Sequence, residues 1–282
     1  MQLQHSIRQP VELFGVGIHT GKPVRMRLLP AAADTGRVFR RIDLAGEPLV
    51  RANPGSISQQ PRRTALCDGD VEVHTCEHLL AAAFALGVDN LTIELDAAEL
   101  PGCDGSSKDF VDALESAYIV EQDTPRLEFC LDRPCSVLRE CGSIIALPYS
   151  RGLRVTYIFA PQDDAFGGAA VVDVEVTAER FVRDIAPART FVTLEEAELA
   201  RAAGLGLGAN YDNTLVWDGA RLLHNSFRFD DEAARHKALD VIGDLALASR
   251  RINAHIVAYR TGHWENLALL REIEETMMGS SN

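Results

Sequence analysis

The segment DEAARHKALDVIGDLALAS occupies residues 231–249, and AHIVAY follows at 254–259. The first has the apolar period of an amphipathic helix, and the second is a short apolar run typical of a strand. Residues 75–86, TCEHLLAAAFAL, are also rich in helix formers, and Leu91–Leu95 then alternates as a strand. Each half of the chain therefore predicts a histidine-bearing helix, a break and an apolar strand.

Further signals place the chain in the α+β class. Thr75 is the expected N-cap of the first helix, and Gly87 is expected to end it. Other strands are predicted at Val24–Leu28, Val155–Phe159 and Val171–Val176. The repeated helix–strand order hints at internal duplication. However, a helix followed by a strand is common in any α+β chain, and from the pattern alone this is the better interpretation.

The polar segment EQDTPR predicts a domain boundary near Thr124 and Pro125, giving domains of residues 1–124 and 125–282. In the second domain, residues 194–203 have the composition of a short charged helix. The glycine-rich stretch GLGLGANYDN follows at 204–213. This block has the character of an insertion.

Composition and charge narrow the functional classes. The chain has 282 residues, of which 46% are hydrophobic and 24% charged, as in an ordinary globular protein. Its amino terminus lacks the pattern of a signal peptide, and its longest apolar stretch, residues 79–88, is far shorter than the ~20 residues of a membrane span. A cytoplasmic protein without a transmembrane segment is expected. The formal net charge of −13 disfavours nucleic acid, so any anionic ligand must meet a local basic cluster.

The cysteines do not predict a structural zinc site, because no two of them form a C-x-x-C pair. Without a secretion signal, reduced thiols are expected, most of them as small buried apolar residues. The six cysteines are Cys67, Cys76, Cys103, Cys130, Cys135 and Cys141.

A metal site is instead suggested by His236 and Asp240, which lie four residues apart and share one face of the predicted helix. Imidazole and carboxylate are suitable zinc ligands. Asp244 continues the same stripe by another turn, whereas Lys237 is expected to point elsewhere. By itself the spacing is weak evidence, because eight histidines make such a pair common, and a solvated helix face is the better interpretation of the spacing alone.

Three other histidines lie in segments that could have a catalytic or ligand-binding role. Glu77 and His78 are adjacent, as in metal sites where one residue holds the metal and the other takes a proton from water. Alternatively, Glu77 is present because the helix dipole favours an acidic residue at the N-terminus of the helix, and His78 is incidental. His263 is expected in a loop before the last helix, as a proton donor or a surface residue. His19 lies in GIHTGK, which is either a ligand-contacting turn or a simple hairpin.

Taken together, these segments resemble the UDP-3-O-acyl-N-acetylglucosamine deacetylase family, which carries out the committed step of lipid A synthesis. Several separate matches in one order are far more specific than any single pair. They are GVGIHTGK (15–22), HTCEHLLAA (74–82), GVDN (87–90), DGSS (104–107), ARTF (188–191), RHKALDVIGDL (235–245) and AYRTGH (258–263).

The resemblance implies two domains of like topology, each a sheet packed on helices, facing each other across the site. It implies a β-α-β insertion at about 190–215 that builds an apolar passage for an acyl chain. It also implies a small-molecule UDP-sugar lipid as the substrate, and a monomer is expected. Ala209 and Asn210 stand where many members have Gly and Ser, which leaves the shape of the passage open.

The family's metal and catalytic roles carry over position by position. The metal would be Zn²⁺, although Fe²⁺ suits the same ligands. The resemblance implies ligands at His78, His236 and Asp240, a general base at Glu77, a general acid at His263 with Asp244 orienting or charging it, and oxyanion or substrate contacts at Thr190 and Lys237.

Further matches concern substrate binding. Phe191 corresponds to an aromatic residue that lines the sugar and acyl region, and Arg260 to a basic residue near the diphosphate. Phe159 corresponds to a residue that stacks on uracil, and His19 is also assigned to substrate binding. One alternative is a metal amidase of the same fold that acts on another acylated amino sugar. A second alternative is a binding protein, with or without structural zinc.

Overall fold

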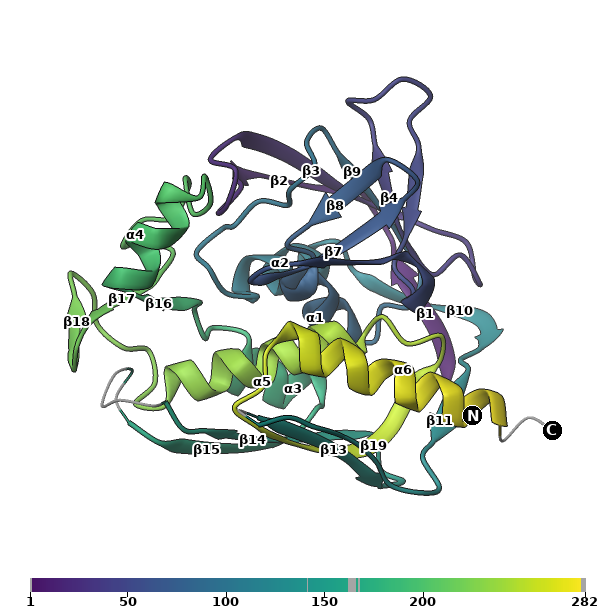
Figure 1. The fold of residues 1–282 in the computed structure, drawn as a ribbon. Coiled ribbons are helices and arrows are strands. Elements are labelled where there is room, and N and C mark those ends of the chain that lie inside the picture. Colours follow the sequence, from purple (N-terminus) through teal and green to yellow (C-terminus); the bar gives the residue numbers. More distant parts are fainter. Residues whose placement is uncertain (1, 141, 162–165, 167, 280–282) are drawn as a thin grey trace.

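The computed structural model describes residues 2–140, 142–161, 166 and 168–279, so Cys141 lies outside the described residues. The protein has the predicted α+β architecture. Two sheets form the outer layers and helices lie between them, with the first half of the chain above and the second half below (Figure 1).

The sheet of the first half has the strand order β2–β3–β9–β4–β5. All its pairs are antiparallel except β4 with β9, which run parallel. The last of these five strands in the chain, β9, thus inserts at the centre of the sheet, between β3 and β4. The strands are β2 (Val11–Val16), β3 (Pro23–Pro30), β4 (Arg37–Arg41), β5 (Leu49–Arg51) and β9 (Leu91–Leu95).

The sheet of the second half repeats this plan in the order β12–β13–β19–β14–β15, with β14 and β19 parallel. This matching topology is the duplication that the family resemblance implied. In addition, β11 (Glu128–Cys130) pairs in parallel with the start of β19. The strands are β12 (Cys135–Leu138), β13 (Ser143–Pro148), β14 (Leu153–Phe159), β15 (Ala170–Glu175) and β19 (Arg251–Tyr259).

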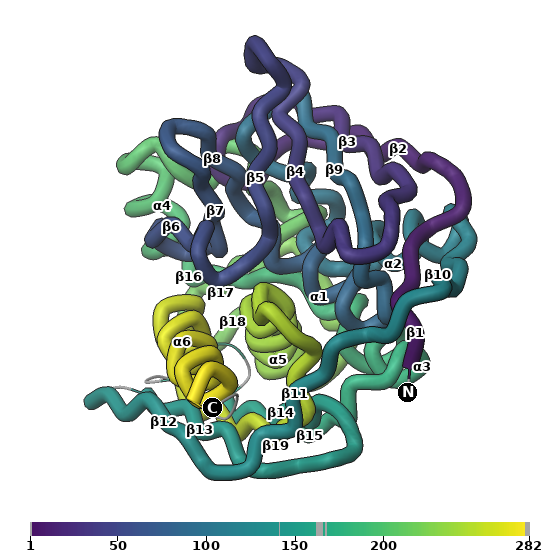
Figure 2. Tube along the Cα trace, turned by 90° about the vertical axis from the view of Figure 1, so that its right-hand side faces the viewer, coloured from purple at the N-terminus to yellow at the C-terminus, as the bar shows by residue number. Residues whose placement is uncertain are grey.

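Each half also places two helices against its sheet, and α1 contacts α5 where the halves meet (Figure 2). Their close approach depends on Gly243, because a Cβ there would lie 2.2 Å from the carbonyl oxygen of Glu77. The interior side chains form one continuous apolar core. The helices are α1 (Glu77–Ala85) and α2 (Lys108–Ser116) in the first half, and α5 (Glu232–Leu245) and α6 (His263–Gly279) in the second.

Each half carries an insertion between its fourth strand and its buried helix. In the first half this is a three-stranded sheet preceded by a short helical turn, η1 (Pro54–Ser56). In the second half it includes a β-α-β unit in which β16 and β17 are parallel, as the resemblance implied. The elements are β6 (Ile57–Gln60), β7 (Arg63–Asp68) and β8 (Val71–His74), then α3 (Ala178–Arg180), η3 (Phe181–Ile185), β16 (Phe191–Thr193), α4 (Leu194–Ala202), β17 (Leu215–Asp218) and β18 (Arg221–Leu223).

The connection between the halves runs through β10 (Ile119–Pro125), which pairs with β1 (Leu3–Ile7). The boundary expected at residues 124 and 125 falls at the end of β10, and the division into two domains there stays a prediction. None of the helices in the described part of the chain has the length and apolar composition needed to cross a membrane.

Some local predictions were wrong. Thr75 does not cap α1; Cys76 occupies the N-cap position. Thr75 instead has a φ of 59°, and its hydroxyl donates to Glu99 at 3.1 Å. The helix predicted over 231–249 ends at Leu245, and the strand predicted from residue 254 begins at Arg251. His263 was expected in a loop but is the first residue of α6.

Candidate metal centre

His78, His236 and Asp240 converge at the contact between α1 and α5. Each offers one ligand atom, and these atoms all lie within 4.8 Å of one another. Nε2 of His236 is 3.5 Å from Oδ1 of Asp240, and Nε2 of His78 is 3.8 Å from the same oxygen. One ligand thus comes from the first turn of α1, and two come from consecutive turns of α5.

The charge states of the three side chains suit a cation. Burial lowers the pKa of His78 to about 3, and burial also lowers the pKa of His236, so both imidazoles are neutral donors. Burial alone would raise the pKa of Asp240, but the Lys237 ammonium and the neighbouring histidines outweigh it, and the carboxyl pKa falls well below its usual value. Two neutral imidazoles and one carboxylate form a familiar zinc ligand set.

Surrounding groups orient His236 and Asp240 and leave the atoms that would bind a metal free of hydrogen bonds within the described residues. Nδ1 of His236 donates to the carbonyl oxygen of Ala188 at 3.0 Å, which fixes the tautomer with a lone pair on Nε2. Oδ2 of Asp240 accepts from Lys237 Nζ at 2.7 Å, whereas its buried Oδ1 has no hydrogen-bond partner within the described residues. An unpartnered buried carboxylate oxygen facing two imidazoles fits a metal ion.

Lys237 corrects one sequence prediction. Its side chain does not point away from the metal face, because its ammonium pairs with Asp240 and lines the same cavity. Burial alone would lower its pKa, but Asp240 outweighs that effect and raises it, so the group stays charged.

Glu77 is buried beside this ligand cluster, at the start of α1. Its Oε2 accepts from the backbone N–H of Thr64 at 3.1 Å, and its Oε1 lies 3.9 Å from Nε2 of His263. Burial raises the pKa of Glu77 to about 7. A carboxyl with that pKa can accept and release a proton near neutrality.

His263 faces Glu77 and is held by a network of polar side chains. Its Nδ1 is 3.0 Å from Oδ2 of Asp244. Burial lowers the pKa of His263, but Asp244 outweighs burial and raises it to about 9. The Thr64 hydroxyl donates to the other Asp244 oxygen, and Asn266 donates to Oδ2 at 2.8 Å.

Sequence reasoning missed Thr64 and Asn266. Asn266 lies one helical turn after His263, so the i, i+3 spacing is a sequence signal that both side chains face Asp244. Thr64 has none, because it lies in β7, far along the chain from both Asp244 and His263. Only the insertion of the first half brings it to the site.

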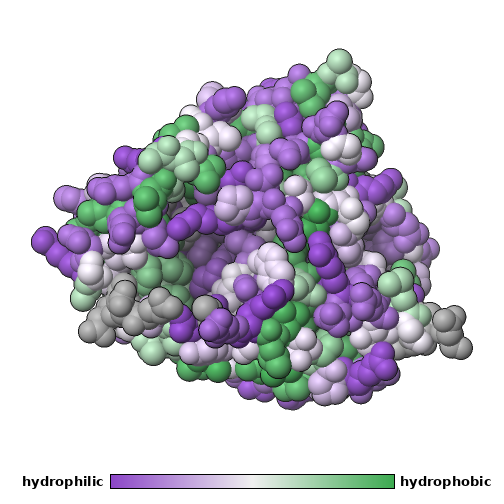
Figure 3. Space-filling model, viewed as in Figure 1, coloured by the Kyte–Doolittle hydropathy of each residue, from purple (hydrophilic) through white to green (hydrophobic). Residues whose placement is uncertain are grey.

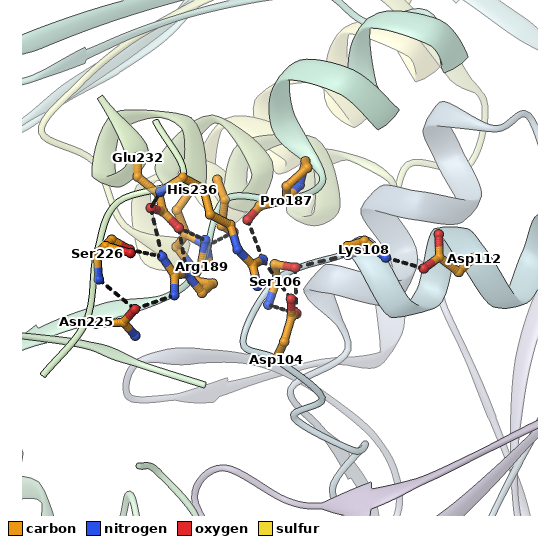
Figure 4. A network of polar contacts seen from close by, with 12 residues as sticks. Asp104, Ser106, Lys108, Asp112, Pro187, Arg189, Asn225, Ser226, Glu232 and His236 are labelled. Carbon is orange, nitrogen blue, oxygen red and sulfur yellow. Dashed lines mark hydrogen bonds and ion pairs between the residues drawn. The ribbon is translucent and has the colours of Figure 1, made fainter. Parts of the chain in front are cut away.

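A buried ion pair supports the segment that carries Thr190 (Figure 4). Nε of Arg189 lies 2.8 Å from Oε1 of Glu232, in the first turn of α5. The same guanidinium donates to the Asn225 side chain at 3.0 Å and to the Ser226 carbonyl at 2.7 Å. These bonds hold the segment leading into β16 against the helix that carries His236. Neither Arg189 nor Glu232 was singled out from the sequence.

A cavity of about 890 Å³ opens beside the metal ligands. In Figure 3, which is viewed from the same side as Figure 1, the molecular surface is hollowed to the left of the centre. The polar side chains that line the cavity near the ligands are Glu77, His78, Thr190, His236, Lys237, Asp240 and His263. One wall comes from the β-α-β insertion and its glycine-rich turn. Its apolar side chains are Phe191, Val192, Leu194, Ala197, Ala200, Ala209 and Val216, and its polar or charged ones are Glu196, Glu198, Arg201, Asn210, Tyr211 and Thr214.

Of the remaining predicted site residues, His19 lines this cavity. The turn around it is fixed by Glu99, which accepts from the backbone N–H groups of His19 at 2.8 Å and Thr20 at 2.7 Å. Phe159 packs behind the wall, with its ring centroid 5.6 Å from that of Phe191. Phe159 and Arg260 are outside the set of described residues that line the cavity, and their assigned contacts stay predictions.

Comparison with known proteins identifies the family of this chain. Residues 4–275 match the family model described as LpxC, UDP-3-O-acyl N-acetylglycosamine deacetylase. The chain is also similar to three curated proteins that carry the name UDP-3-O-acyl-N-acetylglucosamine deacetylase. The relative from Cellvibrio japonicus is 38% identical over 98% of this chain and 91% of its own length. Those from Thioalkalivibrio sulfidiphilus and Bdellovibrio bacteriovorus are each 36% identical, over 96% and 97% of this chain and 89% and 90% of their own lengths.

Proposed function

Because the chain belongs to the LpxC family of UDP-3-O-acyl N-acetylglycosamine deacetylases, we propose that it hydrolyses the acetamide of UDP-3-O-acyl-N-acetylglucosamine. The products are acetate and the free amine, and the reaction is the committed step of lipid A biosynthesis. The observation that carries this proposal is the unpartnered Oδ1 of Asp240, which faces two neutral imidazoles beside Glu77 and His263.

His78, His236 and Asp240 would hold the cofactor, Zn²⁺, with Fe²⁺ as the alternative for the same ligands. When bound, the ion supplies Lewis acidity that activates a water molecule and polarises the amide carbonyl. Three protein ligands are the number found in catalytic zinc sites, which keep a position open.

Glu77 is the general base in this proposal. As the carboxylate it accepts a proton from the attacking water, while the Thr64 N–H holds its Oε2 in place. The negative charge that develops on the carbonyl oxygen is stabilised by the Thr190 hydroxyl and by the positive potential of Lys237. Both side chains line the cavity beside the ligand cluster.

His263 is the general acid. The departing amine must be protonated, and the raised pKa keeps this imidazole charged at neutral pH. Asp244 orients the ring through Nδ1, which leaves Nε2 directed toward Glu77 and the ligand cluster. Acid and base therefore stand on the same side of the cavity.

The apolar side chains on the wall formed by the β-α-β insertion are proposed to hold the acyl chain. Phe191 and Val216 are among the side chains that would contact it, with Ala209 and Asn210 at the turn. The proposed contacts of His19, Phe159 and Arg260 are with the rest of the substrate.

Acetate release from UDP-3-O-acyl-N-acetylglucosamine tests the function directly. We expect turnover by the purified protein, loss of turnover on chelation, and recovery when zinc is restored. Metal analysis of the same samples should show about one ion per chain, as the single ligand set implies. A protein that binds metal but hydrolyses only a different acylated amino sugar would instead favour the alternative amidase. One that neither binds metal nor releases acetate would be a binding protein.

A further inference from the structure

A second cavity, of about 390 Å³, lies where the C-terminal ends of α1 and α5 meet β4, β5 and the segment after β10. Figure 2 faces this side of the molecule, with α1, α5 and β11 near its centre. Its volume lies within the range of small-ligand sites. The metal ligands do not line it.

Arginine dominates the charged lining of this cavity. Among the described residues the lining has five arginines but only two aspartates, in a chain with a net charge of −13. Both carboxylates are already engaged: Asp89 accepts from Arg126 at 2.7 and 3.0 Å, and Asp34 accepts from Gln4 at 2.7 Å. The arginines are Arg37, Arg51, Arg126, Arg250 and Arg251.

Two of these arginines cap the helices that carry the metal ligands. Arg37 donates through Nη2 to the carbonyl of Ala246, the C-cap of α5, at 2.7 Å. Arg251 donates through Nη1 to the carbonyl of Phe84, in the last turn of α1, at 2.8 Å. A guanidinium at a helix C-terminus is favourable, so capping explains part of the cluster.

Helix capping does not account for the whole arginine cluster. Each capping bond uses one of five donors, and the buried Nε of Arg37 has no partner within the described residues. Burial and the neighbouring Arg126 lower the pKa of Arg37, and the same two causes lower that of Arg251 to about 10. Three guanidiniums thus repel one another around a single paired carboxylate, and a bound anion would relieve that repulsion.

We propose that this cavity binds a small phosphorylated anion, either inorganic phosphate or the phosphomonoester of a small metabolite. The planar donor groups of Arg37 and Arg251, each with one capping bond, suit phosphate oxygens. Arg126, whose guanidinium already donates to Asp89, Gln2 and the Gly87 carbonyl, contributes mainly positive charge. The anion bridges the ends of α1 and α5, one from each half of the molecule. It therefore stabilises the helix contact at which the metal ligands meet.

Calorimetric titration of the zinc-loaded, full-length protein with inorganic phosphate, at constant ionic strength, tests the proposal. We expect saturable binding with one site, and a rise in Tm that grows with phosphate concentration, as mass action requires. Glycerol phosphate in a parallel titration distinguishes the two sources. Tighter binding of the ester identifies an organic phosphate, and tighter binding of the free ion identifies inorganic phosphate.

The variant Arg37→Gln should weaken phosphate binding at least about tenfold, because it removes charge-assisted hydrogen bonds. The matched control is Arg40→Gln, on the same strand but paired with Glu94 at 3.2 Å and outside the cavity. Arg40→Gln should bind phosphate as the unmodified protein does.

The double variant Arg51→Gln, Arg250→Gln changes only exposed lining residues, and it provides the test if Arg37→Gln does not fold. It should also weaken binding, by a smaller factor. Absence of phosphate binding, or binding that none of these cavity variants weakens, would overturn the proposal. In the second case the anion would bind elsewhere on the protein. Neither outcome would bear on the proposed deacetylase activity, which acetate release tests separately.

Discussion

The two halves of the molecule have one strand order but supply different groups to the site. The first half gives Glu77 and His78 from the beginning of α1, and the second gives His236 and Asp240 from the middle of α5 and His263 from the beginning of α6. The inserted segments differ as well. One is a small sheet that contributes Thr64, and the other is a β-α-β unit that forms one wall of the cavity.

This difference teaches how a duplicated fold can build an asymmetric site. The repeated sheets and helices place two helix ends in contact, while the chemistry comes from residues that the halves do not share. Loops and insertions can vary without disturbing a packed core, so function is added there. Variants that remove one half's contribution at a time test this division of labour.

The largest effects are expected from the proton-transfer pair, with one residue from each half. Glu77→Ala and His263→Ala should each lower kcat about 10²- to 10⁴-fold, the usual contribution of acid–base catalysis. The double variant should cost less than the product of the two, because the residues act as a unit. Steady-state acetate release measures all three.

Glu94→Gln serves as the control, since that carboxylate pairs with arginines on the outer sheet. It should leave kcat near its normal value. If both single variants kept normal turnover in a folded, metal-loaded protein, the proposed mechanism would be wrong.

The pH dependence of activity distinguishes the contribution of Glu77, from the first half, from that of His263, from the second half, without any substitution. Glu77 must be ionised, so activity falls as pH drops below its pKa of about 7, and His263 must be protonated, so activity falls as pH rises above about 9. Outside this window the rate should change about tenfold per pH unit for each limb. Measuring kcat/KM from pH 5 to 11 checks this, and a profile without the acid limb removes Glu77 from its role.

A smaller effect is expected at Thr64, a positioning residue. Thr64→Val keeps the backbone N–H that holds Glu77 but removes the hydroxyl that donates to Asp244. We expect kcat to fall about tenfold, as for one hydrogen bond to a charged group. Asp244 would then interact more strongly with His263, so the alkaline limb should move to higher pH.

Thr156→Val is the matched control, because its hydroxyl bonds the exposed Asp173 on the opposite sheet. It should change neither kcat nor the pH profile. A Thr64→Val protein that lost activity with an unchanged alkaline limb would argue for a general structural role.

The smallest expected effect, counted per methylene group of the substrate, concerns the cavity wall contributed by the second half's insertion. Burial of one methylene is worth about 0.8 kcal/mol, so kcat/KM should rise about fourfold per methylene of the acyl chain until the passage is filled. A series of substrates differing only in acyl length measures this. Equal kcat/KM across the series would show that the wall does not contact the chain.

Much of the fold could be predicted because periodicity and helix formers act locally. The strand at Leu91–Leu95 has the predicted bounds, and the helix predicted at 194–203 differs by one residue from α4. Thr75 was misassigned because its hydroxyl has a better partner, Glu99, from another part of the chain. Helix ends are decided by such competition, which local sequence does not report.

The sequence by itself determined the family, the α+β class and the candidate residues, since ordered motifs keep their spacing in any conformation. Only the tertiary structure decided which of those residues meet. The packing of α1 on α5 brings three ligand atoms within 4.8 Å, turns Lys237 onto Asp240 and delivers Thr64 to Asp244. It also gathers arginines from distant segments behind the same helices. Burial and proximity set these charge states, and both depend on contacts between residues far apart in the chain.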